Sequence, residues 1–368
     1  MTKNIYVILE DRGVLAVGGD EARSFLQGLI SNDINKVTAD HAIHAALLTP
    51  QGKYLHDFFI AQAADGRLLI DCERERLPDL LKRLKMYKLR AKVDLADVSE
   101  DWTVAALPGF SPTLARIKVA SPGDARAADG GVYFIDPRLE ELGARAILPS
   151  ATAEQALGQD GATAGERPAY DLLRLSLGVP DGTRDMIVDK SILLESGFDE
   201  LHGVDWNKGC YMGQELTART KYRGLIKKRL MPVEIAGPLP EPGTPLILDG
   251  KDVGEIRSTA ATDGGGLGLA LVRWREGVVA VTADAREALG AREGAALARQ
   301  AAGLRMELQT ARQHIQRPTR LERELAEVTK HNTALQAELD NATRKALVLH
   351  RRADSAEERL DAVERRTP

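Results

Sequence analysis

The stretch from Asn207 to Glu215, with the sequence NKGCYMGQE, combines a cation, a thiol and two glycines in one short segment. Cys210 is one of only two cysteines in the 368 residues. Lys208 lies two positions before it, so an extended backbone would present both side chains on one face. A helix that begins after Gly213 would add the partial positive charge of its N-terminus, and both positive charges favour a thiolate. We therefore interpret Cys210 as a candidate reactive or ligating sulfur.

Composition narrows the class of protein. A chain of 368 residues with 43% hydrophobic residues is long enough for two or three domains with a substantial core. The formal net charge of −4 points to no particular partner, so any anion site must be a local patch. Two cysteines exclude a disulfide framework, the first residues do not resemble a signal peptide, and no apolar run reaches the roughly 18 residues of a spanning helix. We expect a cytoplasmic protein with no membrane partner.

The order of the predicted elements indicates an α+β fold, because strands and helices mix without a regular βα repeat. Residues 5–9 and 14–17 flank a polar turn that ends in Gly13 and are predicted to form a β-hairpin. A helix is predicted over residues 78–89. Between residues 230 and 273, short β runs are separated by glycine and proline turns, which is typical of a small barrel or sandwich. Other strands are predicted at residues 43–48, 54–61, 67–72 and 92–98.

The C-terminal part follows a heptad pattern. From Leu321 to Val363, apolar residues recur in alternating steps of four and three, which predicts a coiled coil. Asn332 falls at a core position, where a buried amide favours a parallel dimer in register. The alternatives are a single helix folded onto the body and a frayed tail. Basic and acidic residues balance over residues 319–366, so we expect a parallel homodimer there and no direct nucleic-acid binding.

These patterns predict four segments. An α+β body of two subdomains is expected over residues 1–226, and a small β-barrel domain over residues 227–283. A linker with a weak helix is expected over residues 284–318, where glycines lower helix propensity. The coiled-coil helix is expected over residues 319–366.

A basic run follows the cysteine motif directly. Residues 219–229 contain six basic residues in eleven and no acid. Such a patch suits a carboxylate-bearing cofactor tail, a phosphate or an acidic partner, and the alternative is a solvated turn between domains. Cys72 ends an apolar run and is expected to be a buried structural cysteine. The seven histidines lack the spacing of a zinc site, so no resident metal site is expected.

Three segments resemble the YgfZ-type folate-binding proteins: FLQGLISND at residues 25–33, GVPDG at residues 178–182 and, above all, KGCYMGQE at residues 208–215. Those proteins are relatives of the glycine-cleavage aminomethyltransferase, and their mitochondrial counterparts serve iron–sulfur cluster assembly. The resemblance covers residues 5–285. It implies an aminomethyltransferase-like folate-binding fold around a central hole with a small C-terminal β-barrel, to which the helical coiled coil is an addition.

The resemblance also implies a function and a site. It implies tetrahydrofolate as cofactor and a role in maturing or repairing iron–sulfur enzymes, including those that thiolate tRNA. Two cysteines cannot supply the four ligands of a cluster, so Cys210 would share a transient iron–sulfur cluster with an assembly protein, a client enzyme or glutathione-like thiols. Lys208 and Cys210 are then the functional pair. The residues expected to bind the cofactor are Asp57, Lys208, Tyr211, Gln214, Glu215, Arg219 and Arg223.

Two positions depart from the family pattern. Aminomethyltransferases carry two adjacent aspartates where this chain has His56 and Asp57, which argues against aminomethyl transfer. Many relatives carry a glutamate where this chain has Ser176, which cannot make a charged bidentate pair with a pterin. Our main hypothesis is therefore a non-catalytic maturation factor. The alternatives are a tetrahydrofolate-dependent aminomethyl or methyl transferase, and a coiled-coil scaffold with a degenerate folate-binding body.

Overall fold

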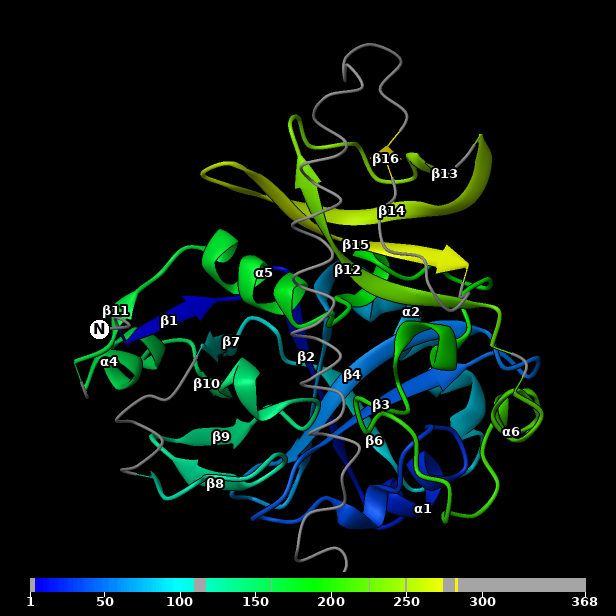
Figure 1. Ribbon diagram of the computed structural model, residues 1–368. Coiled ribbons are helices and arrows are strands. Elements are labelled where there is room, and N and C mark those ends of the chain that lie inside the picture. Colours follow the sequence, from blue (N-terminus) through cyan, green and yellow to red (C-terminus); the bar gives the residue numbers. More distant parts are fainter. Residues whose placement is uncertain are drawn as a thin grey trace, which may run out of the picture. The chain divides into compact units, whose positions relative to one another are not determined.

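The computed structural model describes residues 4–108, 117–159, 161–224, 226–248, 250–273 and 282–283. All described elements belong to one compact unit, Met1–Glu287. They form three mostly antiparallel β-sheets together with short helices (Figure 1), as the predicted α+β class requires. None of the described helices combines the length and apolar composition that crossing a membrane requires.

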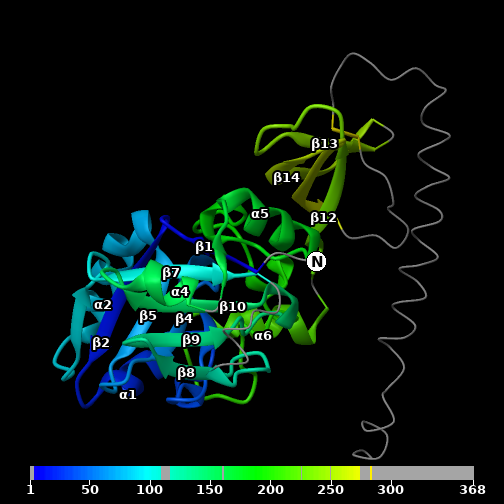
Figure 2. The same cartoon turned by 90° about the vertical axis from the view of Figure 1, so that its left-hand side faces the viewer.

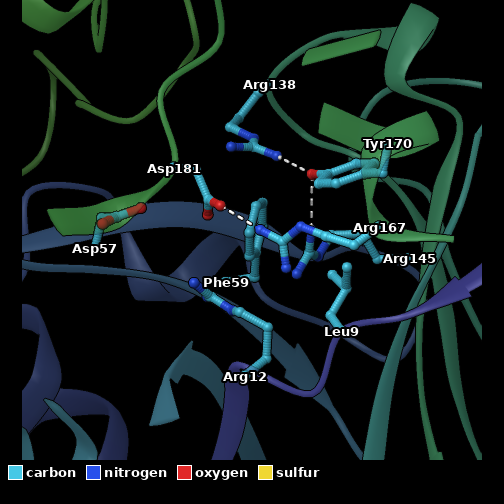
Figure 3. Close-up of a pocket in the computed structure, with 9 residues that line it drawn as sticks. All are labelled: Leu9, Arg12, Asp57, Phe59, Arg138, Arg145, Arg167, Tyr170 and Asp181. Atoms are coloured by element: carbon cyan, nitrogen blue, oxygen red, sulfur yellow. Dashed lines mark hydrogen bonds and ion pairs between the residues drawn. The ribbon is translucent and has the colours of Figure 1, made fainter. Parts of the chain in front are cut away.

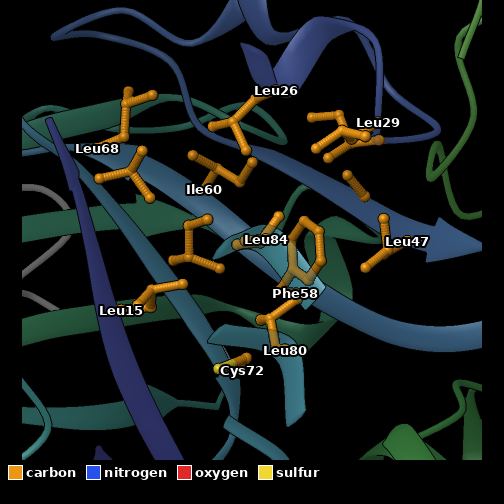
Figure 4. Close-up of a cluster of buried hydrophobic side chains, with 14 of the residues drawn as sticks. Leu15, Leu26, Leu29, Leu47, Phe58, Ile60, Leu68, Cys72, Leu80 and Leu84 are labelled. Atoms are coloured by element: carbon orange, nitrogen blue, oxygen red, sulfur yellow. The ribbon is translucent and has the colours of Figure 1, made fainter. Parts of the chain in front are cut away.

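The first sheet has five strands and a helical layer on one face. Because side chains alternate along a strand, Phe58 and Ile60 of its second strand point into a core with the helices α1 (Ala22–Gln27) and α2 (Leu77–Lys88). Figure 4 shows this core, in which Leu26 and Leu80 lie over the sheet. In spatial order, the strands are β3 (Ile43–Leu48), β4 (Tyr54–Gln62), β5 (Leu68–Glu73), β2 (Arg12–Gly18) and β6 (Asp94–Asp97).

The second sheet has six strands, and its inner face shares a second core with the first sheet. Phe59, from the opposite face of β4, packs there with Val104 and Phe134. The outer face is covered partly by α4 (Ala153–Gly158). The first and second sheets are therefore joined through buried side chains on both inner faces. In spatial order, the strands are β11 (Thr163–Ala164), β1 (Ile5–Ile8), β7 (Trp102–Leu107), β10 (Ala144–Pro149), β9 (Gly131–Ile135) and β8 (Ala125–Ala128).

The predicted N-terminal hairpin is wrong. Strand β1 pairs with β7 and β11 in the second sheet, whereas β2 pairs with β5 and β6 in the first. The chain crosses between the sheets over residues 9–11. Both strands are buried on both faces, so their apolar pattern does not specify a partner. Arg12 favours the observed pairing, because its Nε donates a 2.6 Å hydrogen bond to Asp71 on β5.

The third sheet lies against α5 (Arg167–Ser176), where Leu175 packs with Leu230 and Leu269. The strands in spatial order are β12 (Lys228–Ala236), β15 (Gly265–Arg273), β14 (Lys251–Thr262), β13 (Pro245–Leu248) and β16 (Thr282–Ala283).

Further short helical turns connect these layers. The predicted linker over residues 284–318 and the predicted coiled coil over residues 319–366 lie outside the described residues. The remaining helical elements are η1 (Ile34–Lys36), η2 (Arg74–Arg76), η3 (Glu140–Leu142), η4 (Gly182–Arg184), η5 (Leu193–Ser196) and α6 (Gln214–Tyr222).

Candidate functional site

Lys208 anchors the cysteine-containing loop to the first sheet's helical layer. Its ammonium donates three hydrogen bonds to backbone carbonyl oxygens, at 2.9 Å to Gln27, 2.6 Å to Ile30 and 2.8 Å to Asn32. These carbonyls lie at the end of α1 and just beyond it, where backbone acceptors lack helical partners and a cation is favourable. Lys208 is therefore a buried side chain whose hydrogen bonds connect segments that are far apart in the sequence.

Cys210 lies on the solvent side of the same loop. Its side chain is exposed, whereas Lys208 is buried. The expectation that both side chains share one face is wrong. The Lys208 side chain points into the protein, where carbonyl oxygens accept from its ammonium, whereas Cys210 faces solvent. Burial lowers the pKa of Lys208 to about 8, although Asp33 and Asp205 partly oppose this shift, so the side chain is still a cation near neutral pH.

The loop ends in a close contact between two glycines. Gly213 has φ +82° and precedes α6, so the predicted helix start after this residue is confirmed. A Cβ on Gly213 would lie 2.6 Å from the carbonyl oxygen of Thr49 and 3.0 Å from the Cα of Gly52. Gly52 has φ +70°. Only glycine satisfies both the backbone angle and the spacing at position 213.

The residues around Gly213 divide between buried and exposed positions. The Tyr211 ring is buried, with the Lys208 Nζ 5.0 Å from its centroid. The Tyr211 amide donates a 3.3 Å hydrogen bond to Oε1 of Gln214, which closes the turn before α6. Glu215 instead pairs with Arg219 on the exposed side of the helix. Tyr211 and Gln214 shape the cysteine loop, and Glu215 does not point into it.

Part of the predicted basic run binds the neighbouring loop. The Lys221 ammonium lies 2.9 Å from a carboxylate oxygen of Asp199 and 4.1 Å from the centroid of the Trp206 ring. Arg229 pairs with Glu200. Arg223 is exposed at the end of α6. The run therefore contributes to holding α6 in place as well as to the surface charge.

A polar pocket lies where the first and second sheets meet α5 (Figure 3). The cavity itself is small, about 10 Å³, and the figure rises to about 250 Å³ when the open space around it is included. Among the predicted cofactor-binding residues only Asp57 lines it, so the structure does not bring Arg219 and Arg223 to this pocket. We call it the arginine pocket. Its lining consists of Leu9, Arg12, Asp57, Phe59, Arg138, Arg145, Arg167, Tyr170 and Asp181.

Guanidinium groups surround an aromatic ring at the base of the arginine pocket. The guanidinium carbons of Arg145 and Arg138 lie 4.2 Å and 4.7 Å from the centroid of the Phe59 ring. Arg145 binds Asp71 through two hydrogen bonds, of 2.6 Å and 3.0 Å. These buried cations are thus charge-compensated while still facing the cavity, an arrangement suited to recognising a carboxylate or another anion.

Two carboxylates face the same cavity. Burial alone would raise the pKa of Asp181, but Arg174 and Arg167 outweigh it and hold that pKa below the usual range. Asp57 accepts a 2.8 Å hydrogen bond from the Tyr54 hydroxyl, and its second oxygen lies 3.4 Å from Nε2 of His44. Burial would raise the pKa of Asp57 as well, yet His44 and its other partners lower it. Both carboxylates are therefore ionised acceptors at neutral pH.

A chain of hydrogen bonds links the cysteine loop to the arginine pocket. Asn32 accepts from Lys208 through its carbonyl, and its side-chain amide donates a 2.8 Å bond to the carbonyl oxygen of His44. His44 in turn contacts Asp57, and its ring is buried between Phe59 and Phe198. The network is one structural unit, although its members come from distant parts of the sequence.

Ser176 does not contribute to the pocket. It lies exposed at the end of α5, where its hydroxyl donates a 2.8 Å hydrogen bond to the carbonyl of Leu173. The missing family carboxylate at this position therefore leaves the lining of the arginine pocket unaltered.

Comparison with known proteins identifies the family. Residues 227–297 match the family model described as the CAF17 C-terminal β-barrel domain. The human mitochondrial iron–sulfur cluster assembly factor IBA57 is 32% identical over 285 residues, which cover 73% of this chain and 77% of the human protein. The chain belongs to the IBA57 family. A mitochondrial IBA57 homologue from Mycosarcoma maydis is 36% identical over 238 residues, and the match covers 60% of this chain and 55% of that protein. The chain thus spans only about half of the fungal IBA57 relatives that it matches.

The solved structures confirm the fold class. A glycine cleavage system aminomethyltransferase T from Bartonella henselae superimposes with a TM-score of 0.60 and 17% identity, covering 74% of this chain and 79% of that chain. An aminomethyltransferase-like α+β fold with a C-terminal β-barrel domain is thereby confirmed.

The IBA57 relatives contradict the predicted location. They are named as mitochondrial proteins, so the expectation of a cytoplasmic protein is wrong. That expectation came from a low cysteine count, which indicates a reducing environment and does not say which compartment provides it.

Proposed function

We propose that this chain is an accessory factor in iron–sulfur cluster assembly, and that Cys210 supplies one sulfur ligand to a cluster shared with a partner. The observation that carries the proposal is an exposed cysteine on a loop fixed by a buried lysine. A ligand on a preorganised loop reaches a partner without a further ordering cost. The names of the IBA57 relatives support the same role.

The cluster must be shared because the chain has only two cysteines and the described residues offer no other ligand set. Among the described residues there is no group of three or more metal-ligating side chains. Cys72 is buried, and burial raises the pKa of its thiol well above the ordinary value, so it is an inert core residue. The partner is then an assembly protein or a client enzyme, including the enzymes that thiolate tRNA, and it contributes the remaining ligands.

The polar groups that line the arginine pocket match the donors and acceptors of tetrahydrofolate. An ionised carboxylate offers about four acceptor sites, and Asp57 uses two of them, so pterin N–H groups have acceptors there. Arg138 and Arg145 suit the carboxylates of the glutamate tail. The cavity itself measures only about 10 Å³, far below the usual range for small-molecule sites, so its lining side chains must move apart before a pterin can enter. When bound, tetrahydrofolate supplies a carrier for one-carbon groups. Asp57 and the arginines orient it, and the buried Phe59 limits access of water.

The test is a pair of cysteine variants in cells that depend on this protein. Cys210→Ser is expected to lower the activity of a cluster-dependent enzyme, whereas Cys72→Ser at comparable protein abundance is expected to preserve it. Equal activity of wild type and Cys210→Ser would overturn the proposed role. Turnover of a methyl or aminomethyl donor by purified protein with tetrahydrofolate, unaffected by Cys210→Ser, would instead establish the transferase alternative.

We also propose that the full chain is a parallel homodimer through residues 319–366. Its domains are proposed to be the body at residues 1–226, the β-barrel at residues 227–283, the linker at residues 284–318 and the coiled coil. The heptad pattern and the core position of Asn332 support it. Sedimentation of the full chain is expected to give the dimer mass, and Leu325→Asp with Leu339→Asp is expected to give the monomer. A monomeric wild type would remove this proposal and leave the role of Cys210 untouched.

A further inference from the structure

A second basic segment lies at the C-terminal end of α2, far in sequence from the cysteine loop. Residues 82–92 contain six basic residues in eleven and no acid. Arg83 binds Asp79, at 2.7 Å. The other five cations form no ion pair with any residue that the structure describes. Lys85 and Lys88 lie in the last helical turn, where they complement the helix dipole. Lys82, Arg90 and Lys92 lie outside that turn, so the helix dipole does not account for their positive charges.

Large apolar side chains are exposed among these cations. Met86 is 62% exposed, Tyr87 37% and Leu89 87%. They account for half of the large exposed hydrophobic residues in the described part of the chain, although they lie within four consecutive positions. Such clustering distinguishes a binding surface from the scattered apolar residues of an ordinary surface.

The backbone also holds one of these side chains outward. Leu89 follows α2 with φ +46° and ψ −108°, a positive-φ conformation that a branched side chain rarely adopts. The sequence has leucine at this position with its side chain almost fully in solvent. A residue that favours neither the backbone conformation nor solvent contact points to a requirement other than folding.

A shallow, open groove runs along the same helix. It is lined by Pro78, Leu81, Lys82, Lys85 and Met86, and it encloses about 710 Å³ including the space open to solvent. The lining positions recur at helical spacing, so they form one face of α2. None of them lines the arginine pocket. In Figures 1 and 2, α2 also lies apart from α6, which follows the cysteine loop.

We propose that this face of α2 is a docking surface for an acidic segment of a partner protein, with an apolar side chain of that segment seated in the groove. Lys82 and Lys85 pair with its carboxylates, and Met86 contacts its apolar anchor. The lining places lysines beside apolar residues, which matches a peptide segment that carries carboxylates and apolar side chains together. The proposal is independent of the function proposed for Cys210.

The probe is a fluorescein-labelled peptide that alternates pairs of glutamates with leucines, titrated into the full chain and followed by anisotropy. Saturable binding is expected. Affinity is expected to fall about tenfold or more when serine replaces the leucines or glutamine replaces the glutamates in the peptide.

The protein variants place the peptide on α2. Lys82→Glu with Lys85→Glu, and separately Met86→Asp, are each expected to lower affinity about tenfold or more. The matched charge control, Arg126→Glu with Lys251→Glu on other exposed strand residues, is expected to bind as wild type does. Circular dichroism checks that each variant is folded, and Met86→Asp decides the result if the double variant is not.

Three results would overturn the proposal. One is the absence of saturable peptide binding to wild type, and another is equal binding by wild type and both α2 variants. The third is binding of phosphatidylglycerol vesicles or single-stranded RNA that the α2 variants abolish while peptide binding is unchanged. That outcome would assign the surface to a membrane or a nucleic acid.

Discussion

The Lys208 ammonium donates a 2.6 Å hydrogen bond to the carbonyl oxygen of Ile30, which lies 178 residues earlier in the chain. Together with the bonds to Gln27 and Asn32, it makes one side chain responsible for the position of the cysteine loop. The family motif thus combines two roles in residues that are two positions apart. Lys208 holds the loop, and Cys210 presents a sulfur to solvent.

Lys208→Met is expected to lower the free energy of unfolding by about 2–4 kcal/mol. The substitution leaves buried carbonyl oxygens without donors, and each such oxygen costs roughly 1–3 kcal/mol unless water reaches it. Urea unfolding measures the loss. Lys53→Met is the matched control, since the Lys53 ammonium donates to one exposed carbonyl, that of Lys190, and a change below about 0.5 kcal/mol is expected there. Equal effects of the two substitutions would contradict the anchoring role.

Gly213→Ala is expected to destabilise the fold by about 2–4 kcal/mol, because a Cβ there meets the Thr49 carbonyl at 2.6 Å and the backbone has φ +82°. Gly209→Ala is a control within the same loop, where a Cβ meets no atom within 4 Å. It is expected to be neutral or slightly stabilising. Thermal unfolding of both variants checks the difference, and a similar cost for both would mean that the loop is not packed at Gly213.

Thiol labelling of the native protein is expected to modify Cys210 quickly and to leave Cys72 unmodified until the chain unfolds, because the Cys72 side chain is only 1% exposed. Mass spectrometry of native and denatured samples, treated with an excess of iodoacetamide, distinguishes the two sites. Rapid native labelling of Cys72 would show that the first core opens locally, and slow labelling of Cys210 would contradict its exposed position.

Local patterns allowed the sequence to predict much of the fold. Strand β3 occupies residues 43–48 as predicted, and α2 differs from the prediction by one residue at each end, because apolar spacing alone identifies these elements. The pairing of the strands was harder to predict from the sequence. The apolar pattern of β1 and β2 is satisfied in any buried sheet, so the nearest neighbour in sequence was the wrong partner.

The candidate site shows the same division. The cysteine loop was predictable because its residues are contiguous. The arginine pocket was not, because Arg12, Arg138 and Arg145 come from separate segments and meet only after two sheets pack together. One signal was present in the sequence. Arg145 interrupts the otherwise apolar strand Ala144–Pro149, and a charge at such a position is buried only when a partner such as Asp71 compensates it.

His56 makes acid sensitivity a testable property of the fold. Burial and the nearby Arg76 lower the pKa of His56 from 6.5 to about 4, despite the 2.9 Å contact with Asp79. The unfolded chain therefore binds a proton in this window and the folded chain does not, so stability falls as the pH decreases from 6.5 towards about 4. The loss from this side chain is about 3 kcal/mol over the whole window.

His56→Gln is the variant that isolates this effect, because the glutamine amide can still donate to Asp79 and does not titrate. Urea unfolding at neutral and mildly acidic pH is expected to show a smaller loss for the variant, by about 2 kcal/mol between roughly pH 7 and pH 5. Some acid sensitivity is expected to persist in this range, because the lowered pKa of His44 acts in the same direction. Parallel pH profiles for wild type and variant would show that His56 takes up a proton equally in the folded and unfolded states.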